Sequence, residues 1–191
     1  MNITSFVIYC MIATFTPGPT NIVILSTVHH HGAKKAMKYT YGATVGFGVL
    51  LIISAFLNSA FMAFLPKIIM ILQIIGSGYM LYLSYLICKL DTASPAVNQA
   101  ATFRSGFLMQ FMNPKVVLFA LTVIPAFLVP TYHSRTMMSI SIMVIIGIGF
   151  LGFLTWVLFG AIFKAFLHKH NKIVNVLLAL SLAYAAVMVW L

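Results

Sequence analysis

Two prolines and a glycine occupy three successive positions in the middle of an uncharged apolar segment. The segment runs from Met1 to Val28, and the stretch Thr16 to Asn21 inside it reads Thr-Pro-Gly-Pro-Thr-Asn. Proline has no backbone N–H, so the carbonyls of Ala13 and Phe15 lose their partners four residues later in a helix. In hydrocarbon, broken backbone is tolerated only where protein buries it or where it lines a polar cavity. The stretch therefore predicts a broken membrane helix beside a polar site.

The composition agrees with a membrane protein. Of the 191 residues, 62% are hydrophobic and 6% are charged, whereas a soluble domain is about 25% charged. The length suits a single domain over residues 1–191. Eleven Lys and Arg residues stand against one acid, but they lie in short connections between apolar runs. Such a distribution is typical of charges facing anionic headgroups and argues against nucleic-acid binding.

Six apolar segments approach the roughly 20 residues that a bilayer requires. They cover about residues 3–28, 41–65, 68–88, 105–129, 137–163 and 173–191. Gly42 and Gly46, four residues apart in the second segment, predict a close approach between two helices. Basic loops are expected at 29–38 and 164–172. An alternative with five spans leaves one apolar segment unplaced.

The basic residues also predict an orientation. With the N-terminus outside, the inner connections hold eight of the basic residues: Lys34, Lys35, Lys38, Lys89, Arg104, Lys164, Lys169 and Lys172. The outer connections hold only Lys67 and Arg135. Because cytoplasmic loops are enriched in Lys and Arg, six spans place both termini outside.

A second break, Asn113-Pro114-Lys115, opens the second half of the chain. Each half thus begins with a proline-broken span and contains three spans, so the halves, about 1–90 and 103–191, enter the membrane in opposite directions. This predicts an all-α fold of two inverted three-helix repeats with a site between the broken helices. The predicted substrate-binding residues surround the two breaks: Ala13, Phe15, Thr16, Pro17, Gly18, Pro19, Thr20, Asn21, Gln110, Asn113, Pro114 and Lys115.

These motifs, in this order, resemble the LysE/RhtB family of bacterial amino-acid exporters. The resemblance rests on Thr16 to Asn21, Gly32 and Gly46, the run 103–107 with Gln110, and the Asn-Pro-Lys at 113–115. It covers essentially the whole chain. It implies an inner-membrane efflux protein for amino acids or their derivatives, of the cysteine/O-acetylserine, threonine/homoserine or leucine type. The family usually reads Pro-Gly-Pro-Asn, whereas here Thr20 takes the place of that asparagine and Asn21 follows.

Within that family, the last segment, Asn175 to Tyr184, is similar to the cysteine and O-acetylserine exporters. The residues narrow the substrate independently, because no Asp or Glu lies in any predicted span. A cationic side chain would remain unpaired in a dry site, so a small neutral zwitterion is expected. Its ammonium would bind carbonyls freed by the prolines, and its carboxylate a half-helix N-terminus. Because the spans contain no acid, they also lack the carboxylate relay of many proton-coupled carriers. The sequence therefore does not indicate which ion drives export.

Lys115 is the one charged residue inside a predicted span. It lies eleven positions after Arg104, which corresponds to about 16 Å along a helix. Two roles stay open for it. Its long apolar stem allows the ammonium to reach the inner headgroups. Alternatively, the ammonium pairs with the substrate carboxylate across from Thr20 and Asn21.

Other function classes fit less well. A channel or a non-transporting structural subunit would use the same spans. An intramembrane enzyme would need a nucleophile with a base, or a metal cluster, and no predicted span contains His, Asp or Glu. His29 to His31 are consecutive and lack ligand spacing, and Cys10 and Cys88 form no motif, so neither a metal nor a cofactor is expected. The expected partners are an amino-acid substrate and the lipid bilayer, and the sequence is also compatible with a homo-oligomer.

Overall fold

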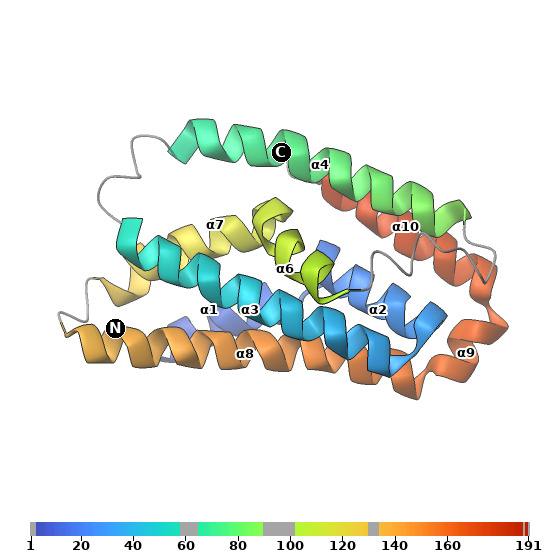
Figure 1. Ribbon diagram of the computed structural model, residues 1–191, viewed down its shortest axis with the longest axis horizontal. Coiled ribbons are helices and arrows are strands. Elements are labelled where there is room, and N and C mark those ends of the chain that lie inside the picture. The colour runs from blue at the N-terminus through green and yellow to red at the C-terminus, as the bar shows by residue number, and fades with distance from the viewer. Residues whose placement is uncertain (1–2, 58–64, 90–101, 130–133, 189, 191) are drawn as a thin grey trace.

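The computed structural model describes residues 3–57, 65–89, 102–129, 134–188 and 190. Every regular element in that part of the chain is a helix (Figure 1), as the sequence predicts. The elements are α1 (Ile3–Phe15), α2 (Pro19–His31), α3 (Ala33–Leu57), α4 (Leu65–Lys89), α6 (Phe103–Met112), α7 (Pro114–Val123), the π-helical turn η1 (Ile124–Leu128), α8 (Arg135–Ile162), α9 (Lys164–Lys169) and α10 (Asn171–Met188).

The first predicted break separates α1 from α2, whose axes are bent by 48°. Pro19 stands in the first turn of α2, where its missing N–H is harmless and its fixed φ suits a helix. The residue before it, Gly18, is extended and provides no side-chain cap. The prediction of a proline-broken first helix is confirmed.

The second predicted break separates α6 from α7, which are bent by 66°. Asn113 is extended, and its side-chain oxygen accepts a hydrogen bond from the backbone N–H of Lys115 at 3.1 Å. Asparagine is a favoured helix cap because it satisfies a free N–H in this way. Pro114 again stands at the start of the new helix. This break, too, confirms the prediction.

The predicted basic loop at 29–38 is wrong. α2 continues to His31 and α3 begins at Ala33, so Gly32 alone makes the connection. Its φ of +80° lies in the region that favours glycine, because a side chain would clash there. The other basic stretch, 164–172, is also mostly helical, since α9 and the start of α10 fill it.

Several of the helices are suited to a membrane. α3, α8 and α10 are each long and apolar enough to cross one, and counting each bent pair as one span brings the number to five. On α4, the described apolar stretch is shorter, Gln73–Cys88. The described part of the chain therefore has between three and five candidate spans by length and composition, and the sixth stays a prediction.

Helix α3 packs on both α6 and α8. Its contact with α6 is especially close. A Cβ added to Gly42 would collide with the carbonyl oxygen of Phe103, and one added to Gly106 would collide with that of Tyr39. At Gly46 the added Cβ would lie 2.6 Å from the Phe107 carbonyl oxygen. The backbones of α3 and α6 thus touch directly, which confirms the close approach predicted from the glycines.

Helices α3, α6 and α8 form one packed unit, and helices α4 and α10 form a second unit along the other side of the molecule (Figure 1). Serine hydroxyls tie the pair together, because Ser84 donates to the Ala179 carbonyl at 2.8 Å and Ser77 to the Ala186 carbonyl at 3.2 Å. Between the units lies α2, whose residues from Pro19 to His29 are all buried. Its C-terminal end is held by α10, since the ring of His29 hydrogen-bonds to Asn171 at 2.6 Å. The two breaks therefore lie between the two units.

Candidate functional site

Thr20 joins the two breaks. Its hydroxyl oxygen accepts a hydrogen bond from the Asn113 amide at 3.0 Å and from the Gln110 amide at 3.3 Å. All three side chains are at most 3% exposed. Gln110 also donates to the carbonyl of Gly106, one turn earlier, at 3.1 Å. The first turn of α2 is thereby fixed against the junction of α6 and α7.

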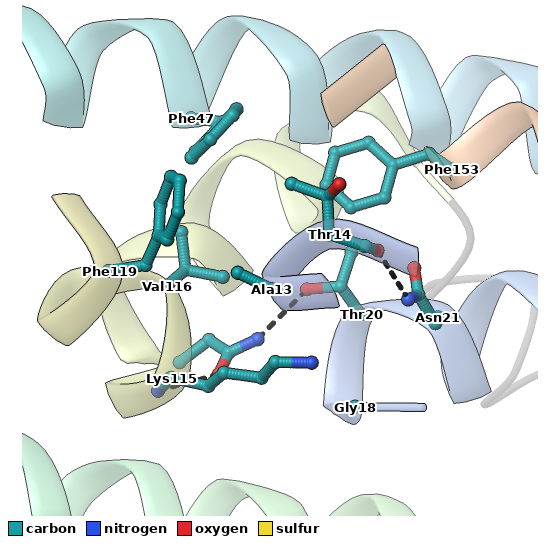
Figure 2. A pocket seen from close by; sticks show the side chains of 11 residues that line it. Ala13, Thr14, Gly18, Thr20, Asn21, Phe47, Lys115, Val116, Phe119 and Phe153 are labelled. Carbon is teal, nitrogen blue, oxygen red and sulfur yellow. Dashed lines mark hydrogen bonds between the residues drawn. The ribbon is translucent and has the colours of Figure 1, made fainter. Parts of the chain in front are cut away.

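Lys115 reaches from the second break to the first. Its ammonium donates to the hydroxyl oxygen of Thr16 at 2.8 Å, to the Thr16 carbonyl at 3.2 Å and to the Pro17 carbonyl at 3.4 Å. Figure 2 shows its stem running beside Gly18. The last carbonyls of a helix carry partial negative charge, so the end of α1 suits a cation.

Backbone carbonyls at the end of α1 also have protein partners other than Lys115. The side-chain amide of Asn21 donates to the Thr14 carbonyl at 3.1 Å and to the Thr16 carbonyl at 2.9 Å. The indole N–H of Trp156, on α8, donates to the Phe15 carbonyl at 3.1 Å. The Phe15 carbonyl, which loses its helical partner because of Pro19, therefore accepts a hydrogen bond from Trp156 instead. Burial without a partner would destabilise such groups.

A small cavity of about 30 Å³ lies between the breaks. Polar groups face it on one side and the rings of Phe47, Phe119 and Phe153 on the other (Figure 2). Its full lining is Ala13, Thr14, Gly18, Thr20, Asn21, Phe47, Asn113, Lys115, Val116, Phe119 and Phe153. A volume of this size accommodates about one or two water molecules, which is too small for an amino acid.

A much larger groove, of about 890 Å³, adjoins the small cavity. It shares Gly18, Asn113 and Lys115 with that cavity. Its remaining lining is mostly apolar and comes largely from α10: Pro17, Pro19, Ile22, Gln73, Pro114, Leu118, Leu177, Leu180, Ser181, Tyr184, Ala185 and Met188. Small-molecule sites occupy about 300–1,000 Å³ and combine apolar walls with a few polar groups. The groove has this character, with Lys115 at its polar edge.

The structure thus brings all the sequence-predicted residues to the two breaks. Ala13, Thr20 and Asn21 line the small cavity, and Pro17, Pro19 and Pro114 line the groove, while Gly18, Asn113 and Lys115 line both. Phe15, Thr16 and Gln110 contribute through the hydrogen bonds described above. Sequence reasoning missed the α10 wall of the groove and the aromatic residues of α3, α7 and α8.

Two buried amide oxygens at the site accept no hydrogen bond. They are Oδ1 of Asn21 and Oε1 of Gln110, among the side chains that the structure describes. A buried acceptor without a partner is destabilising, and such exceptions are uncommon in folded proteins. The two oxygens are further hydrogen-bond acceptors close to Thr20. Over the same described residues, His, Cys, Asp and Glu form no group of three or more suited to a metal.

Comparison with known proteins identifies the family. Residues 11–191 match the sequence profile described as LysE type translocator. The chain belongs to the LysE translocator family. This LysE-family chain is therefore a multi-pass membrane translocator, and its family consists of transporters and not enzymes.

Curated relatives of this LysE-family translocator cover almost the full length of both chains. The cysteine/O-acetylserine efflux protein of Klebsiella pneumoniae is 32% identical, over 97% of this chain and 95% of the relative. The protein of the same description from Salmonella typhimurium is 31% identical over 100% and 98%, and the one from Escherichia coli is 26% identical over 98% and 97%. No solved structure matches the chain.

Proposed function

We propose that this translocator exports a small neutral amino acid, of the cysteine or O-acetylserine type, across the bacterial inner membrane. The observation that carries the proposal is the junction of the two breaks, where Thr20 hydrogen-bonds to Asn113 and Lys115 binds the end of α1. Broken helices that meet inside a bundle are how many transporters build substrate sites. The efflux proteins similar to this chain support the substrate class.

The site has complementary groups for the two ends of an amino acid. The Lys115 ammonium and the N-terminal turns of α2 and α7, which begin at Pro19 and Pro114, favour a carboxylate. The carbonyls of Thr16 and Pro17 favour an ammonium. We assign substrate binding to the whole predicted set around the breaks.

The charges of the site favour a neutral substrate. The sequence contains a single acid, Asp91, and the helices that the structure describes contain none. A lysine or arginine substrate would bring a second cation beside Lys115 with no carboxylate to pair it, which is strongly unfavourable in a dry site. A neutral zwitterion adds no net charge.

The proposed topology has six spans in two inverted repeats, about 1–90 and 103–191, within one domain and with both termini outside. It is supported by the two bent helix pairs, of 48° and 66°, that open the two halves. The distribution of basic residues supports the orientation. A periplasmic reporter fused after residue 191 is expected to be active, and a cytoplasmic reporter inactive. The reverse pattern would contradict this topology.

Metabolite profiling of the medium tests the function directly. Cells that overproduce the protein are expected to accumulate cysteine, O-acetylserine or a similar neutral amino acid outside, relative to cells with an empty vector. Purified protein in liposomes is expected to transport the same compound with saturation, because binding at a defined site limits the rate. Flux that does not saturate would indicate a channel, and an absence of flux would indicate a structural subunit.

A further inference from the structure

An ammonium group already occupies the end of α1. The three acceptors around Lys115 Nζ are the Thr16 hydroxyl oxygen, the Thr16 carbonyl and the Pro17 carbonyl. The Thr16 hydroxyl hydrogen is engaged elsewhere, because it donates to the Ile12 carbonyl at 2.6 Å, so its oxygen is free to accept. A primary ammonium has three donors. The first break therefore provides a set of acceptors that matches a –NH₃⁺ group in number and charge.

An α-amino acid carries the same group. We propose that Lys115 is a tethered competitor for the substrate ammonium, a mechanism that rests on the proposed export of amino acids. In the structure its Nζ fills the acceptor set at Thr16 and Pro17. An arriving amino acid draws Nζ to its carboxylate, and its own ammonium takes the vacated acceptors.

The surroundings of Lys115 permit this exchange. Its stem passes close to Gly18, where an added Cβ would lie 3.2 Å from Cδ and 3.3 Å from Nζ. Lys115 also lines both the small cavity and the groove of about 890 Å³. The four-carbon stem of a lysine is flexible and its ammonium behaves as a mobile point charge. The groove thus gives the amino acid room to arrive and the lysine side chain room to turn toward it.

Charge pairing makes the exchange selective for zwitterions. When an amino acid binds, Lys115 gains a carboxylate and the acceptor set keeps an ammonium, so no charge is left unpaired. An amine without a carboxylate would displace Lys115 and leave its cation unpaired, which is unfavourable in a partly buried site. A carboxylic acid without an amine would leave the Pro17 carbonyl without its ammonium partner and the Thr16 carbonyl with Asn21 alone, and the loss of a partner is also unfavourable.

Trp156 provides a reporter beside this acceptor set, because its indole donates to the Phe15 carbonyl. The sequence contains two tryptophans, so Trp190→Phe leaves Trp156 as the single tryptophan, which is excited selectively at wavelengths that tyrosine does not absorb. The purified single-Trp protein is titrated with L-cysteine, with its decarboxylated amine cysteamine and with its deaminated acid 3-mercaptopropionate, under reducing conditions. The three probes share the same thiol and differ only in their charged groups.

In the single-Trp protein, cysteine is expected to bind at least about tenfold more tightly than cysteamine or the acid, since one charged hydrogen bond is worth that factor or more. Lys115→Met is expected to weaken cysteine binding and to gain binding of cysteamine by about tenfold or more, because the acceptors are then vacant. Adding Thr16→Ala to the Met variant is expected to reduce the gain, because one of the three acceptors, the hydroxyl oxygen, is then lost. Lys38→Met, which removes an exposed charge on α3, serves as the control and keeps the original pattern.

The inference is overturned if cysteamine binds the Lys115→Met protein no better than the parent, or if cysteamine and cysteine bind the parent equally. If the Met protein does not fold, Lys115→Gln serves instead. Its neutral amide fills the acceptors less strongly than an ammonium, so a gain of cysteamine binding is again expected. The gain of cysteamine binding by the Lys115 variants does not depend on which amino acid the protein exports. Failure of the proposed function would instead appear as unchanged medium composition with the parent protein.

Discussion

The two breaks solve the same problem by different means. At the first, Gly18 offers no side-chain cap, and the released carbonyls of Phe15 and Thr16 are bonded by Trp156 and Lys115 from distant helices. At the second, Asn113 caps its own helix through the backbone N–H of Lys115. The first break thus combines a local partner, Asn21, with partners from distant helices, whereas the second is capped locally.

The difference assigns different roles to the breaks. A locally capped turn holds its shape whatever occupies the cavity, so the second break presents Asn113 and Gln110 as fixed donors to Thr20. At the first break, Lys115 bonds the Thr16 hydroxyl oxygen and the carbonyls of Thr16 and Pro17, and its flexible stem allows the ammonium to leave them. Fixed donors therefore face exchangeable acceptors across the site.

Removing the first break is expected to have the largest effect. Replacing Pro17 and Pro19 with Ala restores both N–H groups, and the carbonyls of Ala13 and Phe15 then bond within a continuous helix. Export is expected to fall to the level of cells without the protein, while membrane insertion persists. Both are measured in the same cells, by medium composition and by immunoblotting of membranes. Normal export at normal protein level would show that the broken backbone is not part of the site.

Removing the ammonium that links the breaks is expected to be nearly as severe. Lys115→Met keeps most of the stem and deletes the charge, so export is expected to fall by at least about tenfold with insertion intact, since a charged contact is lost. Lys115→Arg keeps the charge in a planar group and is expected to give an intermediate rate. Initial rates of efflux from loaded liposomes measure both. Wild-type export by the Met variant would mean that the contact of Lys115 with Thr16 and Pro17 is not needed for transport.

Removing the cap of the second break is expected to affect stability first. Asn113→Ala deprives the Lys115 N–H of its cap, which costs about 0.5–2 kcal/mol, and also deletes the hydrogen bond to Thr20. Thr20→Val removes the hydrogen bonds from Asn113 and Gln110 but keeps the cap, so it is the matched variant. Thermal unfolding in detergent is expected to rank them, with Asn113→Ala the less stable. An equal loss in both would show that the cap itself contributes little.

The smallest effect is expected from Trp156. Trp156→Phe deletes the N–H that serves the Phe15 carbonyl, a loss of about 1 kcal/mol for a neutral hydrogen bond. Trp190→Phe is the matched control, because that indole donates to the Ser77 hydroxyl oxygen at 2.8 Å and lines neither the small cavity nor the groove. Both are expected to lose similar stability, and only Trp156→Phe to lower export, by a few-fold. Equal export by the two variants would separate Trp156 from the site.

The breaks were predictable because proline acts locally. The missing N–H groups of Pro17, Pro19 and Pro114 determine where helices must end, whatever surrounds them. The close contact of Gly42 and Gly46 with α6 follows from local chemistry as well. The sequence therefore indicated the helical fold class and both breaks, while substrate binding by the twelve residues around them stays a proposal.

Other features depend on how distant helices pack. Trp156 and the α10 wall of the groove lie in apolar runs, where one helical position resembles another until the partner helix is known. The basic stretch at 29–38 was predicted as a loop because of its charges, yet one glycine, Gly32, suffices to connect the helices. Charge marks the membrane edge but does not end a helix there.

The bare contact between α3 and α6 has a mechanical consequence. Where Gly42, Gly46 and Gly106 bring two backbones together, no side chain lies between them to change rotamer and absorb a displacement. Sliding or rotation of one helix against the other would force backbone atoms into each other. The pair is therefore expected to move as a single rigid body that carries Gln110 with it, which leaves the breaks and Gly32 as the joints at which a transport cycle can bend the molecule.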